Sequence, residues 1–286
     1  MNKLKVLELL AGIGACSKAL ERLGIDFEIV DYVEIDKYAV RSFNAMHNTR
    51  FEVQDITTWD KDIDVDLIMH GSPCQDFSLA GLQAGGDEGS GTRSSLMYET
   101  IRIVEKLKPK YVIWENVKNL LSKKHKHNFD AYLDKMNQLG YSNYYQVLNA
   151  KDYGIPQNRE RVFFVGFRKD LNADFTFPNP TCDEPVTLES AIGDITEKPN
   201  FYYGRKDDNI EHSRPNHDVL TTKFGAFYYR GNRRRCWQQP SFTINATADF
   251  VPLHPSSPKM MYFGHENWNF QKDKKSEYRR LSVREC

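Results

Sequence analysis

Strand-like and helix-like segments alternate through the first 170 residues of this chain, and this order constrains the fold more than any other feature. Short runs rich in apolar and β-branched residues, typical of strands, cover residues 5–10, 27–34, 66–70, 111–115, 144–148 and 161–167. Amphipathic stretches typical of helices cover residues 15–23, 37–47, 94–107 and 128–139. Strands that alternate with helices form mainly parallel sheets covered by helices. We therefore predict an α/β fold with a doubly wound, mostly parallel sheet.

The sequence after residue 170 has a different texture, with frequent prolines, aromatic residues and arginines. Such a composition favours short strands and long loops over further strand–helix units. We therefore predict a first domain over residues 1–170, followed by a smaller, irregular, β-rich region.

Charge is distributed unevenly along the chain, although the formal net charge is zero. Residues 1–199 hold 24 Lys and Arg against 30 Asp and Glu, whereas residues 200–286 hold 15 against 9. A basic segment after an acidic one fits a nucleic-acid partner, although runs of charge also occur on solvated faces.

The chain has no stretch of about 18 apolar residues, which argues against a membrane span. The N-terminus runs into a strand-like segment without a basic leader, so we expect a cytoplasmic protein. Five cysteines, at positions 16, 74, 182, 236 and 286, are widely spaced and include no C-x-x-C pair. That spacing fits neither a disulfide framework nor a zinc site, and we expect no metal.

A glycine-containing turn, Leu10–Gly14, links the first expected strand to the first expected helix. Gly12 and Gly14 allow a tight turn and a close approach of a ligand to the helix N-terminus. Glu34 ends the second strand, where a carboxylate accepts hydrogen bonds from ribose hydroxyls. Ser17 stands where a G-x-G-x-x-G dinucleotide motif has its third glycine. The pattern therefore favours a nucleoside cofactor of the S-adenosylmethionine type over a dinucleotide.

Cys74 follows the expected strand 66–70, and Glu115 ends the neighbouring strand. Open α/β sheets bind ligands at the carboxyl ends of their strands, where both residues would lie. Pro73 stiffens the turn before the cysteine. A thiolate and a protonatable carboxyl in one crevice suit conjugate addition to a pyrimidine, with sulfur attacking carbon 6 and the acid bonding ring N3 and the exocyclic amine. Carbon 5 then becomes nucleophilic enough to take a methyl group.

Five segments, in matching order and spacing, resemble motifs of the cytosine-5 DNA methyltransferase family. Residues 71–78 resemble Pro-Cys-Gln-x-Phe-Ser, residues 115–117 match Glu-Asn-Val and residues 157–161 match Gln-x-Arg-x-Arg. Residues 10–14 resemble the cofactor loop, with Leu in place of a usual Phe at its start and Ala in place of a Gly just after it. Residues 279–286 resemble the opening of the ninth motif.

The resemblance covers nearly the whole chain and implies a division of labour along it. Residues 1–170 would form a Rossmann-like catalytic domain that binds S-adenosylmethionine, and residues 171–275 a target-recognition region. Residues 276–286 would start the segment that returns to the catalytic domain.

The resemblance also implies roles for individual residues. Cys74 would be the nucleophile, Glu115 the acid at N3 and N4 of cytosine, and Arg161 the donor to its O2. Arg159 would support the same pocket. Residues expected to bind S-adenosylmethionine are Leu10, Ala11, Gly12, Ile13, Gly14, Glu34, Ile35, Asp55, Ile56, Pro73 and Leu96. Residues expected to contact double-stranded DNA are Gln75, Ser78, Arg93, Arg233, Arg234 and Arg235.

Two polar segments have open interpretations. The basic run 231–235 has aromatic neighbours and either contacts phosphates and bases or forms a solvated loop. The lysine-rich segment 122–127 holds His125 and His127 without partners at metal-ligand spacing, and we expect a solvated loop there.

Two other functions remain alternatives to DNA methylation. One is methylation of cytosine in RNA, because a branch that resembles this family modifies transfer RNA; that branch tends to carry Pro-Pro-Cys-Gln, where this chain has Ser72-Pro73-Cys74-Gln75. The other is a DNA-binding subunit without turnover. The chain ends within the segment that resembles the ninth motif. We therefore expect either a split enzyme, with a second polypeptide that carries the tenth motif, or a sequence cut short, in preference to an inactive remnant.

Overall fold

The computed structural model describes residues 3–73, 93–202, 215–265 and 267–286. Two compact units make up the chain: residues 1–148 with 160–178, and residues 149–159 with 179–286. The segment 149–159 therefore groups with the C-terminal part of the chain, and the residues before and after it belong to the first unit.

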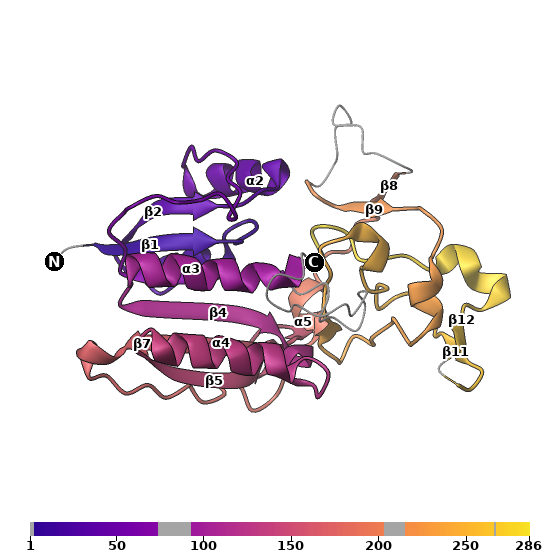
Figure 1. Ribbon diagram of the computed structural model, residues 1–286. Helices are drawn as coiled ribbons and strands as arrows, with labels where there is room; N and C mark the ends of the chain where they lie inside the picture. The colour runs from indigo at the N-terminus through magenta and orange to yellow at the C-terminus, as the bar shows by residue number, and fades with distance from the viewer. Residues whose placement is uncertain (1–2, 74–92, 203–214, 266) are drawn as a thin grey trace. The chain divides into compact units, whose positions relative to one another are not determined.

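A six-stranded sheet forms the centre of the first unit (Figure 1). Its strands, in spatial order, are β2 (Phe27–Val33), β1 (Leu4–Leu9), β3 (Leu67–His70), β4 (Tyr111–Val117), β7 (Glu160–Arg168) and β5 (Tyr141–Asn149). The pairs β1–β2, β1–β3 and β3–β4 are parallel, whereas β4–β7 is antiparallel. The prediction of a mostly parallel sheet is therefore confirmed.

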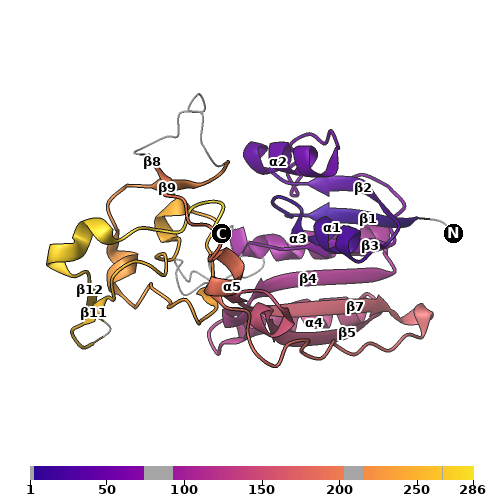
Figure 2. The same cartoon turned by 180° about the vertical axis from the view of Figure 1, so that it is seen from behind.

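Helices cover both faces of this sheet. The helices are α1 (Ala15–Arg22), α2 (Lys37–His47), α3 (Met97–Leu107) and α4 (Lys126–Gln138). Helices α3 and α4 lie on one face (Figure 1) and α1 on the other (Figure 2), as expected for a doubly wound sheet. The α3–α4 face packs the larger core, which includes Ile68, Trp114 and Phe164, while Val6, Leu67 and Met69 face α1.

Local sequence accounts for where α2 begins. Asp36 caps α2, because its Oδ1 accepts hydrogen bonds from the N–H groups of Tyr38 at 2.7 Å and Ala39 at 3.1 Å. The helix expected over 94–107 is split into a 3₁₀ turn, η1 (Arg93–Leu96), and α3. The remaining 3₁₀ turns are η2 (Lys118–Leu121), η3 (Ala150–Tyr153), η4 (Lys169–Leu171), η5 (Ala226–Tyr229), η6 (Ala248–Phe250) and η7 (Lys272–Glu277).

The second unit consists of short elements joined by loops, as its proline-rich sequence predicts. It contains α5 (Leu188–Ile192) and three strand pairs: parallel β6 (Gln157–Asn158) with β10 (Ser241–Phe242), parallel β8 (Asn200–Tyr202) with β9 (Asp218–Leu220), and antiparallel β11 (Met261–Tyr262) with β12 (Trp268–Asn269). Across the described ranges, no helix is both long and apolar enough to cross a membrane.

The last residues of the chain are part of the interior of the second unit. Arg280 is buried and donates hydrogen bonds to Tyr228 Oη and to the carbonyl groups of Leu220 and Thr222. Glu285 is also buried and is held by both terminal nitrogens of Arg279, at 2.7 and 2.8 Å. Residues 276–286 thus group with the second unit, and the functional division at residues 170 and 275 stays a prediction.

Candidate active site

Strands β4 and β7 bring Glu115 and Arg161 together. The antiparallel register pairs Val117 with Arg161 and Glu115 with Phe163, so these side chains share one face of the sheet. Arg161 Nε lies 2.7 Å from Glu115 Oε1. Both side chains are partly shielded from water, at 16% exposed for Arg161 and 31% for Glu115. A carboxyl and a guanidinium with polar atoms still reachable from solvent suit recognition of a planar polar ligand.

Gly71 connects this pair with the glycine-containing turn. A Cβ placed on Gly71 would lie 3.8 Å from Glu115 Oε2 and 3.8 Å from the carbonyl oxygen of Leu10. The ends of β1, β3 and β4 therefore meet at one place, as expected for the carboxyl edge of a parallel sheet. Pro73 follows and is half-buried. Cys74, Gln75 and Ser78 lie outside the described residues.

The turn after β1 requires unusual backbone angles. Leu10, Gly12 and Gly14 have φ values of 53°, 56° and 87°, in the left-handed region that favours glycine. No atom lies within 4 Å of a Cβ placed on Gly12, whereas one placed on Gly14 would lie 2.6 Å from ring carbons of Phe43. The turn thus has an open side at Gly12 and a closed side at Gly14.

Glu34 fixes the open side of this turn. Its Oε2 accepts a hydrogen bond from the N–H of Gly12 at 3.1 Å, and its Oε1 accepts one from Asp36 at 2.9 Å. The exposed side chains of Ile13 and Ile35 stand beside these polar groups in sequence, at 53% and 62% exposure. Carboxylate oxygens for a ribose and apolar side chains for a purine fit an adenosine-like group.

The other residues expected at the cofactor site differ in how exposed their side chains are. Asp55 is exposed, and its Oδ1 accepts hydrogen bonds from the N–H and hydroxyl of Thr57. Ile56 is buried in the main core, and its carbonyl accepts a bond from Arg102, so its side chain has a packing role. Ala11 and Leu96 are partly buried against apolar clusters, and Arg93 begins η1.

Arg159 and Arg161 belong to different units. The N–H of Arg159 donates to Asn149 Oδ1 at 3.0 Å, and its carbonyl accepts a hydrogen bond from Ala150 at 3.0 Å. These contacts hold the backbone of Arg159 within the second unit. Arg161, two residues later, pairs with Glu115 in the first unit.

The family model for C-5 cytosine-specific DNA methylases matches residues 4–286 of the chain. The chain belongs to this family. It is 36% identical over 286 residues to the Type II methyltransferase M.MthTI of Methanothermobacter thermautotrophicus, a match that covers 98% of this chain and 84% of that protein. It is 37% identical over 291 residues to the Type II methyltransferase M.FnuDI of Fusobacterium nucleatum, covering 99% and 82%.

Solved structures support the fold of this C-5 cytosine methylase. The S. pombe Dnmt2 methyltransferase superposes with a TM-score of 0.63 at 17% identity, over 99% of this chain and 84% of that one. The Entamoeba histolytica methyltransferase EhMeth gives 0.66 at 14% identity, over 100% and 85%. The expectation of a second polypeptide finds no support in these relatives.

The basic run of the methylase packs against aromatic rings of the second unit. The guanidinium of Arg233 lies 3.5 Å from the ring centre of Phe227, and that of Arg235 lies 4.0 Å from that of Phe242. Arg234 Nε donates to the carbonyl of Pro255 at 3.1 Å. Burial lowers the pKa of both Arg233 and Arg235. A fully solvated basic loop is therefore wrong for this run, and its contact with DNA stays a prediction.

The structure also corrects the interpretation of His125. This residue is 1% exposed and precedes α4, whereas a solvated loop was expected; His127 is exposed. Within the described part of the chain, no cluster of three or more His, Cys, Asp or Glu residues is arranged to hold a metal.

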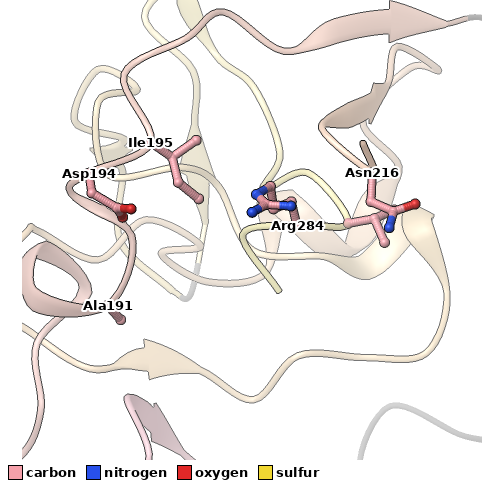
Figure 3. Close-up of a pocket in the computed structure, with 6 residues that line it drawn as sticks. Ala191, Asp194, Ile195, Asn216 and Arg284 are labelled. Carbon is pink, nitrogen blue, oxygen red and sulfur yellow. The ribbon is translucent and has the colours of Figure 1, made fainter. Parts of the chain in front are cut away.

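A pocket of about 450 Å³ lies in the second unit, away in sequence from every expected site residue (Figure 3). It is lined by Ala191, Asp194, Ile195, Asn216, Val283 and Arg284. Arg284 projects toward the interior of the pocket in the close-up, and Asp194 and Ile195 come from the chain after α5. Val283 and Arg284 lie in the segment that resembles the ninth motif, but nothing in the sequence indicated that they line a pocket with residues 191–195.

Proposed function

We propose that this C-5 cytosine methylase transfers a methyl group to carbon 5 of a cytosine that is flipped out of duplex DNA. The observation that carries the proposal is the Glu115–Arg161 pair beside Gly71, three residues before Cys74. A base stacked inside a duplex cannot bring its ring against side chains at this sheet edge, which is why the proposal includes base flipping.

The reaction follows from the chemistry of these side chains. The thiolate of Cys74 forms a bond to carbon 6, while Glu115 protonates N3, so the ring electrons shift toward carbon 5. Arg161 donates to O2 and holds the ring in the plane of the carboxyl. Carbon 5 then takes the methyl group and N3 returns its proton to Glu115. Loss of the carbon 5 proton to water breaks the bond between carbon 6 and sulfur and restores the thiolate.

S-adenosylmethionine, when bound, would supply the methyl group as an electrophile and leave as S-adenosylhomocysteine. Gly12, Ile13, Glu34, Ile35 and Asp55 are the residues of this chain proposed to hold its adenosine part. Leu10 and Pro73 are the residues proposed to line the cofactor site on the side of Glu115. The adjacency of the Leu10 carbonyl and the Glu115 carboxylate at Gly71 supports this arrangement.

Double-stranded DNA is the proposed partner, with Gln75, Ser78, Arg93 and the run 233–235 as proposed contacts. The 15 Lys and Arg against 9 Asp and Glu in residues 200–286 support binding to a phosphate backbone.

The deciding experiment compares nucleic-acid substrates. The purified chain is incubated with S-adenosylmethionine carrying a tritiated methyl group and either duplex DNA or transfer RNA. We expect label in DNA, recovered as 5-methylcytosine and mapped by bisulfite sequencing. Label in transfer RNA alone would make the protein an RNA methyltransferase. DNA binding without label in either substrate would indicate a binding subunit without turnover.

A further inference from the structure

Ser72 is a buried polar residue at the start of the segment that carries Cys74. Its side chain lies two residues before the cysteine, and the residue is 4% exposed. Trp114 Nε1 donates to Ser72 Oγ at 2.8 Å, and Asn116 Nδ2 donates to both the Oγ and the carbonyl of Ser72 at 3.2 Å. The reaction described above uses none of these three side chains.

The two donors flank Glu115 on β4 but point to the opposite face. Side chains alternate along a strand, so Trp114 and Asn116 share the side away from the Glu115–Arg161 pair. Both are about 1% exposed, whereas Glu115 is reachable from solvent. Residues 114–116 of β4 therefore present the Glu115 carboxyl on one face of the sheet. On the other face, Trp114 and Asn116 donate hydrogen bonds to Ser72.

Other contacts hold both donors in fixed orientations. Asn116 Oδ1 accepts the N–H of Val117 at 2.8 Å, which leaves its Nδ2 group directed at Ser72. The Trp114 ring stacks on His70 with 14° between the rings and packs against Tyr132 at 4.3 Å between centroids. Tyr132 Oη in turn lies 3.1 Å from His70 Nε2. A rigid aromatic cluster thus orients the indole N–H.

We propose that Ser72 is a positioning residue, whose hydroxyl and carbonyl tie the segment of Cys74 to the strand of Glu115 through Trp114 and Asn116. This inference rests on the proposed function, because it assumes that Cys74 and Glu115 act on the same base. Bond formation at carbon 6 and proton delivery at N3 are coupled, so the two groups must be placed together. A misplacement of about 1 Å lowers such a rate by about 100-fold.

The test measures covalent trapping on a duplex that contains 5-fluorocytosine, at saturating S-adenosylmethionine. Ser72→Ala removes the hydroxyl acceptor, Trp114→Phe removes one donor, and Ser72→Thr keeps the hydroxyl. Tyr141→Phe is the matched control, because it removes another buried hydrogen bond of the same unit, from Tyr141 Oη to the carbonyl of Pro109 at 2.6 Å. Covalent trapping by the unaltered chain is measured first. If the unaltered chain is not trapped, the proposed function is wrong, and this result says nothing about Ser72.

We expect Ser72→Ala and Trp114→Phe each to slow trapping and lower kcat by about 10- to 100-fold, with KM for DNA and cofactor within about twofold. The double variant should lose less than the two single losses combined, because both substitutions remove the bond from Trp114 to Ser72. Ser72→Thr should recover most of the rate, and Tyr141→Phe should lose stability but keep kcat.

Two results would overturn the inference. One is trapping by Ser72→Ala within about twofold of the unaltered chain, with a loss of stability like that of Tyr141→Phe. The other is a rate loss that appears equally in Tyr141→Phe, which would make it a general effect of destabilisation. If Ser72→Ala does not fold, Trp114→Phe with Ser72 intact decides by the same criteria.

Discussion

Arg161 Nε lies 2.7 Å from Glu115 Oε1, across the antiparallel pair of β4 and β7. The contact is diagonal, since Arg161 is opposite Val117 and two positions from the partner of Glu115. The guanidinium orients the carboxyl in the structure, and under the proposed function both groups would form hydrogen bonds to the cytosine. Preorganised groups of this kind act without reorganisation at the moment of reaction.

The first prediction concerns the nucleophile. Cys74→Ser should lose methyl transfer by several orders of magnitude, because an alcohol is far less ionised than a thiol near neutral pH. Binding of duplex DNA should persist in a gel-shift assay. A 5-fluorocytosine duplex should trap the unaltered chain covalently, since carbon 5 then carries no proton to remove. A trapped complex with Cys74→Ser would exclude Cys74 as the attacking group.

The second prediction concerns the acid. Glu115→Gln keeps the size of the side chain but cannot protonate N3, so the single-turnover rate should fall by about 100-fold or more. Cofactor affinity measured by calorimetry should change little, because Glu34 and Gly12 lie on the other side of Gly71 along the edge. A rate within a few-fold of the unaltered chain would remove Glu115 from the chemistry.

The order of strands and helices in the first unit was predictable because apolar periodicity is a local signal. The strand expected over 161–167, for example, lies within β7, and the helix expected over 37–47 matches α2. The position of β7 between β4 and β5 was not predictable, because pairing between distant segments leaves no trace in local periodicity. The grouping of 149–159 with the second unit was missed for the same reason.

The sequence predicted only those site residues whose side chains could take part in the reaction directly. Glu115 and Arg161 stood out by their motifs, and the structure brings them into contact. Ser72 and Asn116 lie within the recognised motifs and Trp114 lies within the expected strand 111–115, but the sequence assigned a role to none of the three, because it does not show which side chains of neighbouring strands meet. For Arg233 and Arg235, the sequence shows charge but not the phenylalanine rings that lie against them.

The third prediction compares two glycines of the cofactor turn. Alanine at Gly12 or Gly14 is strained by about 1–2 kcal/mol, because both residues have left-handed φ angles. At Gly14 the added Cβ would also overlap Phe43, which adds about 1–3 kcal/mol of overpacking. Gly14→Ala should therefore lower the free energy of unfolding in urea clearly more than Gly12→Ala. Equal losses would mean that Phe43 moves aside without cost.

The fourth prediction separates charge from packing in the basic run. Replacing Arg233 and Arg235 by lysine keeps two positive charges but loses the planar stacking on Phe227 and Phe242. The matched variant replaces Arg233 and Arg235 by alanine and so removes both charges. If the run contacts phosphates, the lysine variant should keep the salt dependence of DNA binding, whereas the alanine variant should show a weaker salt dependence. Both variants should be less stable, so binding is measured only where circular dichroism shows folded protein. Unchanged affinity and salt dependence in the alanine variant would show that these arginines pack within the second unit and do not contact DNA.

The last prediction concerns pH. Burial lowers the pKa of His254 to about 4, and the neighbouring Arg279 acts in the same direction. An unfolded histidine has a pKa of about 6.5, so between these values the unfolded chain binds the proton and the folded chain does not. Stability associated with His254 is therefore fully present above about pH 6.5 and is lost as pH falls toward 4.

Removing the titrating ring should make the chain less sensitive to acid in this window. The variant His254→Gln should reduce the dependence of the unfolding free energy on pH by up to about 1.4 kcal/mol per pH unit, the value for one proton. Part of the dependence should remain, because burial also lowers the pKa of His70, to about 3. Urea unfolding followed by circular dichroism between pH 4.5 and 7.5 makes the comparison. An identical slope in His254→Gln would show that the pKa of His254 is not lowered in the folded chain.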